Sequence, residues 1–140
     1  MSRRLQSVFA MLMAALPALA APQSAPDYRC RIERITMPGI PKASVEYWEK
    51  LYEGKEFTVD RQTGIMAGTL KNLFTTKPVV IDIGSDQNSF KVVTTMRRDQ
   101  GAGIGSNVYV LVVRELEKAP RKPFLFLDNE DTFIGTCEHF

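Results

Sequence analysis

Hydrophobic and polar residues alternate along most of the chain, with the period of two that is typical of half-buried β-strands. In residues 27–35, for example, Tyr28, Cys30 and Ile32 alternate with charged residues. Similar runs, separated by turns rich in glycine, proline and polar residues, cover 56–61, 65–71, 78–84, 89–98, 107–116, 124–127 and 132–140. The pattern predicts about eight antiparallel strands, and their regular spacing is typical of a β-barrel or a β-sandwich.

One segment has the three- and four-residue spacing of an amphipathic helix. Residues 44–53 place Trp48 and Tyr52 at that spacing, with Ser44 as a candidate N-cap and Gly54 as a stop. The sequence therefore predicts a mainly β domain with one short helix.

The N-terminal segment has a different composition. A basic start precedes an apolar run, and residues 18–20, Ala-Leu-Ala, supply small residues two apart. This order is typical of a cleavable secretory signal, and the apolar run is too short to span a bilayer. We predict a signal peptide at 1–20, a flexible leader at 21–26 and a single β domain at 27–140. The mature chain would then have no membrane span and a periplasmic or secreted location.

Removal of the signal changes the charge balance. The full chain has 18 basic and 16 acidic residues, and Arg3 and Arg4 would be lost with the signal. The mature domain is then formally neutral, which argues against nucleic acid or an anionic membrane as the partner. The one histidine of the chain, His139, excludes mechanisms that need two imidazoles.

The two cysteines, Cys30 and Cys137, lie near opposite ends of the predicted domain. In an oxidising compartment an even number of cysteines indicates disulfides, so we predict a Cys30–Cys137 bridge. The bridge would join the ends of the domain, which favours an up-and-down barrel over a two-sheet sandwich. The alternative is a soft-metal site formed by Cys137 and His139, which would require Cys30 to be reduced.

In size, in Tyr28-x-Cys30 and in a disulfide to the far end, the chain resembles the small periplasmic β-barrel inhibitors of lysozyme. The resemblance covers architecture only, because their inhibitory motif, Ser-Gly followed shortly by Tyr, is absent here. It therefore implies a barrel and assigns no functional residue to this sequence.

The sequence has no strong catalytic motif. It lacks a Gly-x-Ser-x-Gly elbow, and both cysteines are assigned to the bridge. Asp82 with Glu56 or Asp60 is a possible carboxylate pair for glycoside hydrolysis. The acidic turn 128–131 lacks the ligand spacing of a calcium loop. We predict a protein that is not an enzyme and that uses no metal or cofactor.

Aromatic and basic side chains near loops favour a binding role, because these residue types are common interface anchors. The predicted binding surface comprises Tyr47, Trp48, Tyr52, Arg97, Arg98, Arg121 and Lys122. We expect a small exported, non-catalytic binding domain that acts on a protein or a component of the cell envelope. The alternatives are a small-ligand carrier that uses the barrel interior and, third, a carboxylate-based hydrolase.

Overall fold

The computed structural model describes residues 24–140, so the predicted signal peptide and the start of the predicted leader lie outside the described residues. The described elements are, in order, β1 (Tyr28–Thr36), α1 (Lys42–Tyr52), β2 (Glu56–Val59), β3 (Met66–Gly68), β4 (Val79–Ile83), β5 (Phe90–Met96), the 3-10 helix η1 (Arg98–Gln100), β6 (Asn107–Val113), β7 (Lys122–Asp128) and β8 (Asp131–His139).

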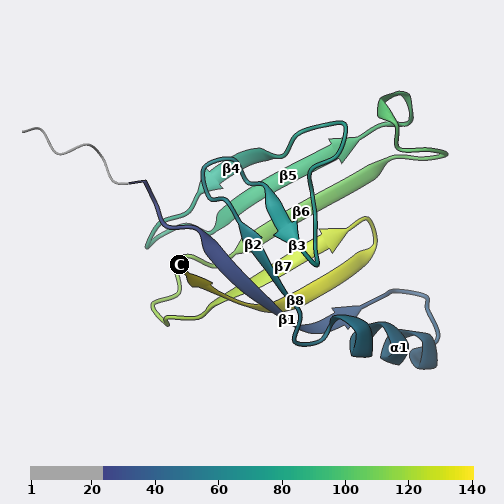
Figure 1. Ribbon diagram of the computed structural model, residues 1–140, viewed down its shortest axis with the longest axis horizontal. Coiled ribbons are helices and arrows are strands. Elements are labelled where there is room, and N and C mark those ends of the chain that lie inside the picture. Colours follow the sequence, from purple (N-terminus) through teal and green to yellow (C-terminus); the bar gives the residue numbers. More distant parts are fainter. Residues whose placement is uncertain (1–23) are drawn as a thin grey trace, which may run out of the picture.

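The eight strands form one antiparallel sheet in the order β3-β2-β1-β8-β7-β6-β5-β4. Strands that are neighbours in the sheet are also neighbours in the chain, except for β1 and β8, whose pairing joins the two ends of the domain. The sheet curls into a half-barrel (Figure 1), whose edges are β3 and β4. The predicted fold class is therefore confirmed, and the sheet stays open between two strands that are consecutive in the chain.

The predicted Cys30–Cys137 disulfide is present and joins directly opposed residues of β1 and β8. Pairing of the same two strands runs from Tyr28 opposite His139 to Thr36 opposite Thr132. A disulfide is consistent with an oxidising compartment. Within residues 24–140, no helix has both the length and the apolar character needed to cross a membrane.

Large apolar side chains fill the concave side of the sheet. Alternate residues of β1, β5, β6, β7 and β8 are buried, as period-two alternation predicts. The largest fully buried side chains include those of Tyr28, Phe57, Phe90, Phe126 and Leu111. The core is therefore rich in aromatic rings.

Two buried polar side chains stabilise the open edge between β3 and β4. The guanidinium group of Arg61 donates hydrogen bonds to the carbonyl oxygens of Ile83 (2.8 Å) and Gly84 (3.0 Å), at the end of β4. Asn72 hydrogen-bonds two backbone groups at the start of β3 and so fixes the β3–β4 connection. These contacts satisfy backbone groups that strand pairing would otherwise satisfy.

Helix α1 lies at one end of the half-barrel, beyond the paired ends of β1 and β8 (Figure 1). The predicted N-cap, Ser44, is wrong: the helix begins at Lys42, after Pro41, and no side chain caps it. Pro41 is the N-cap residue, and its carbonyl accepts hydrogen bonds from the amides of Ser44 (2.9 Å) and Val45 (3.1 Å), so Ser44 already lies inside the first turn. No residue of α1 is buried, so the helix covers the end of the sheet and stays largely in contact with solvent.

Candidate functional site

A cleft of about 160 Å³ lies between α1 and the end of the sheet. Its lining comes from β1, the β1–α1 connection, α1, β7 and β8, and consists of Ile35, Met37, Trp48, Tyr52, Asp128, Asp131 and Phe133. We call it the α1 cleft.

Aromatic side chains form much of the wall of the α1 cleft. The ring of Tyr52 packs edge-on against Phe133, with centroids 5.2 Å apart, and the ring of Trp48 lies 6.3 Å from that of Tyr52. Trp48 is 39% exposed, so the wall is open on one side. Such a wall offers a ligand apolar area and the negative faces of aromatic rings.

Two carboxylates contribute to the same cleft. Asp128 and Asp131 are directly opposed across the β7–β8 turn, and alternation along β8 places Asp131 on the same face as Phe133. Both are half-buried, and neither forms an ion pair within residues 24–140. Burial raises the pKa of Asp128, and the charge of Asp131 raises it further. The cleft thus combines aromatic walls with negative charge that lacks a counter-ion.

The β7–β8 turn that carries these carboxylates is fixed by Asn129. This residue has a φ of 54°, a left-handed conformation that asparagine tolerates better than most residues. Its side-chain oxygen accepts a hydrogen bond from the backbone amide of Val108 (3.0 Å), and its backbone amide donates to the Val108 carbonyl (2.8 Å). The turn is therefore bonded to β6, which fixes the backbone that carries the two carboxylates.

The structure brings together the aromatic part of the predicted binding surface. Trp48 and Tyr52 line the α1 cleft. Tyr47 lies beside it, 60% exposed, with its ring 5.6 Å from that of Trp48. The helix therefore presents one aromatic residue inward, one at the mouth of the cleft and one to solvent.

The basic part of the predicted surface is divided between two places. Arg97 and Arg98 lie in the β5–β6 connection, and the guanidinium group of Arg97 pairs with Asp99 at 3.0 Å. Lys122 begins β7, and its ammonium group donates to the backbone carbonyl of Glu117. None of these side chains lines the α1 cleft.

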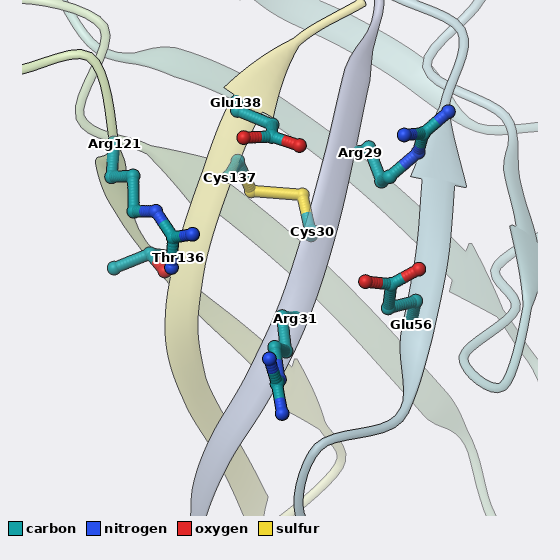
Figure 2. Close-up of a pocket in the computed structure, with 8 residues that line it drawn as sticks. All are labelled: Arg29, Cys30, Arg31, Glu56, Arg121, Thr136, Cys137 and Glu138. Carbon is teal, nitrogen blue, oxygen red and sulfur yellow. A yellow bond between two sulfur atoms is a disulfide. The ribbon is translucent and has the colours of Figure 1, made fainter.

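Arg121 lines a different cavity, of about 50 Å³, beside the disulfide. Figure 2 shows its guanidinium group next to Thr136, with Arg31 on the neighbouring strand β1. Glu56 and Glu138 line the same cavity, so acidic groups stand among the arginines. This small cavity, lined by three arginines and two glutamates, is separate from the α1 cleft.

A polar cluster lies at the opposite end of the half-barrel, around Glu115. This carboxylate accepts a hydrogen bond from the Tyr28 hydroxyl (2.7 Å) and lies 3.0 Å from Nε2 of His139 and 3.6 Å from the Arg61 guanidinium group. Burial raises the pKa of Glu115, but the hydrogen bonds from Tyr28 and His139 and the charge of Arg61 outweigh it, so the pKa is lowered.

The chemistry of this cluster favours a structural role. Burial raises the pKa of Tyr28, and the hydrogen bond to Glu115 raises it further. The phenol therefore stays protonated at neutral pH, which makes it a poor nucleophile. His139 is held by Glu115, and Arg61 by the end of β4. The cluster thus ties the C-terminal strand to the open edge of the sheet.

Two of the three carboxylates considered for hydrolysis take part in turns. Asp82 accepts a hydrogen bond from the Gly84 amide (2.8 Å), and Asp60 accepts two from amides of the β2–β3 turn (both 2.9 Å). Glu56 lines the cavity beside the disulfide. Asp60 and Asp82 therefore stabilise the backbone where they stand.

The acidic half of the α1 cleft is absent from the predicted binding surface, although the sequence holds a signal for it. A two-residue turn makes Asp128 and Asp131 direct partners, and Asp131 lies two residues before the apolar Phe133. The sequence pattern predicts a turn at 128–131 between the strands 124–127 and 132–140, which leaves both residues outside the alternation. Only tertiary packing, however, shows that α1 lies over this turn.

Comparisons of the chain with protein-family models, with curated protein sequences and with solved structures found no match. The function is therefore inferred from the geometry of the α1 cleft and of the surface around it.

Proposed function

We propose that the protein is a small exported, non-catalytic binding domain that docks a segment of a partner protein at the α1 end of the half-barrel. The observation that carries this proposal is the α1 cleft, half open and surrounded by exposed apolar side chains. Export is supported by the signal-like N-terminal pattern and by the disulfide.

Exposed apolar side chains lie on α1 and on the segment that leads into it. Tyr47 is 60% exposed, Leu51 45% and Ile40 43%, and all three belong to α1 or the segment that leads into it. A single exposed apolar side chain is ordinary, whereas a group on one element is typical of an interaction site. Tyrosine and tryptophan are also enriched among the residues that dominate binding energy. The surface is therefore suited to a protein partner.

The size of the cleft favours a protein partner over a carried small molecule. Pockets for drug-sized ligands measure roughly 300–1,000 Å³. The α1 cleft, at about 160 Å³, matches a single side chain. The carrier alternative would use the barrel interior, where the rings of Tyr28, Phe57 and Phe90 are fully buried. A polypeptide that inserts one side chain is the better match.

Site-specific photo-crosslinking in cells that export the protein tests the proposal. A photoreactive phenylalanine in place of Tyr47 or Leu51 should form a discrete adduct with one protein. The same group in place of Ile104, which is 95% exposed in the β5–β6 connection, should not. Adding Trp48→Ala should abolish the adduct. Equal adducts from position 104, none from α1, or an adduct that persists without Trp48 would contradict the proposal.

A further inference from the structure

We infer that the α1 cleft binds an alkylammonium group, such as the end of a lysine side chain that the partner inserts. This inference rests on the proposed function, since it names the chemical group that the same cleft recognises. It depends on three features of the cleft: its uncompensated charge, its aromatic walls and its size.

The negative charge of the cleft favours a cation as the ligand. Asp128 and Asp131 face each other across two paired strands, and no basic side chain of residues 24–140 forms an ion pair with either. Two half-buried carboxylates repel each other, and each loses part of its hydration. Within the part of the chain that the structure describes, the side-chain hydrogen bond to this pair comes from the amide group of Asn129, which donates to Asp128 at 3.1 Å. A cation between the carboxylates would relieve both costs.

The walls of the cleft select an organic cation. A cation within about 6 Å of an aromatic ring centroid is attracted by the ring face. Trp48, Tyr52 and Phe133 supply such rings, and Ile35 and Met37 supply apolar contact for an alkyl stem. The same walls are unfavourable for a hard metal ion, since calcium takes six to eight oxygen ligands and magnesium six.

The size of the cleft limits how much of the ligand enters. A volume of about 160 Å³ admits a short chain and its charged head, and leaves the rest of the ligand outside, against Tyr47 and Leu51. The ligand is therefore recognised by one inserted ammonium group, with the exposed part of α1 contacting whatever carries it.

Trp48 makes the inference testable, because it is the only tryptophan of the chain and it lines the cleft. Titration of the purified protein with n-butylammonium should change the Trp48 fluorescence with saturation in about the millimolar range, which is typical of small fragments. The neutral analogue 1-butanol, which has the same number of heavy atoms, should bind at least about tenfold more weakly. Calcium should cause no change.

Two variants and a matched control test whether binding of the ammonium group requires the charges of Asp128 and Asp131. Asp128→Asn and Asp131→Asn should each weaken n-butylammonium binding about tenfold or more, whereas Asp86→Asn, an exposed acidic residue of the β4–β5 turn, should leave it unchanged. Thermal unfolding of each variant verifies that it is folded. Equal binding of 1-butanol, a response to calcium in place of the amine, binding that survives both substitutions, or no saturable response would overturn the inference.

A peptide pair separates this inference from the proposed function. Acetyl-Gly-Lys-Gly-amide should bind at least as tightly as n-butylammonium, and its glutamine counterpart about tenfold more weakly. If the amine binds and the lysine peptide does not, the cation site stands with a free amine as its ligand, and the protein-docking proposal fails. If Trp48-dependent crosslinking at Tyr47 succeeds and the amine does not bind, the docking proposal stands and the inference fails.

Discussion

Asp128 is the residue at which stability and the proposed binding oppose each other. Burial and the neighbouring charge of Asp131 raise its pKa, so the folded protein resists ionisation of this carboxyl group more than the unfolded chain does. A group with a raised folded pKa lowers stability above that pKa, and the cost disappears as the pH falls through it. A functional role of the Asp128 charge, such as ligand binding, would explain why the protein retains this cost in stability.

We predict that Asp128→Asn stabilises the protein at pH 7 by about 0.5–1 kcal/mol, a small figure because solvent screens a half-buried pair. The gain should shrink as the pH is lowered, because the wild-type carboxyl then becomes protonated as well. Urea unfolding at pH 7 and pH 4 measures both effects, with Asp86→Asn as the control. A loss of stability at pH 7 would show that the hydrogen bond from Asn129 outweighs the repulsion.

At the scale of elements, local sequence pattern predicts where strands lie better than where they end. The strand predicted at 107–116 stops at Val113, because Arg114 and Glu117 form a turn closed by their own ion pair at 2.7 Å. The strand predicted at 65–71 is paired only at Met66–Gly68, because the chain then turns away and Asn72 bonds back to it. Periodicity records which face is buried and does not reveal such capping contacts.

The same limit explains why only part of the candidate site follows from sequence. Helical spacing brings Trp48 and Tyr52 to neighbouring positions on one element, so their proximity is a local property. Contact between Tyr52 and Phe133 joins residues far apart in the chain and depends on how α1 packs against the sheet. The separation of Arg121 from the helix aromatics has the same origin. A pattern along one chain does not contain these distances.

Strand β4 is an exposed edge with an unusual amount of apolar surface. Val79 is 59% exposed, Ile81 62% and Ile83 44%, and β4 pairs on one side only, with β5. Exposed apolar edges are templates for pairing with another chain, and natural proteins usually protect them with charge or irregularity. Here the bulge between Val80 and Asp82 is such an irregularity.

We predict that Ile81→Lys lowers self-association of the concentrated protein, with a change in the free energy of unfolding of within about 0.5 kcal/mol. Sedimentation velocity over a range of concentrations measures the association. The control is Ile104→Lys, which removes a side chain of the same type from a loop, where it is 95% exposed. Equal effects of the two substitutions would show that general hydrophobicity, and not the strand edge, drives the association.

At the scale of the whole molecule, two devices hold the curled sheet together at different places. The disulfide reinforces β1 and β8, which are already paired along their length, and its 107-residue separation mainly restricts the unfolded chain. Arg61 acts in the folded state, where it connects the β2–β3 turn to the end of β4 and to Glu115. Loss of the disulfide should therefore lower the stability of the whole domain, whereas loss of the Arg61 side chain should destabilise the open edge of the sheet.

We predict that Arg61→Met lowers the free energy of unfolding by about 3 kcal/mol, because it leaves Glu115 without its buried cationic partner and two carbonyls at the end of β4 without donors. Native-state hydrogen exchange should show faster exchange in the turn after β4, at and beyond Gly84, and at the Arg61 amide, with smaller changes in β6 and β7. Replacement of both cysteines by alanine, the comparison variant, should instead lower protection throughout the core, by about 2–5 kcal/mol. Uniform loss of protection in Arg61→Met would contradict a local role, because the open edge would then unfold only with the whole sheet.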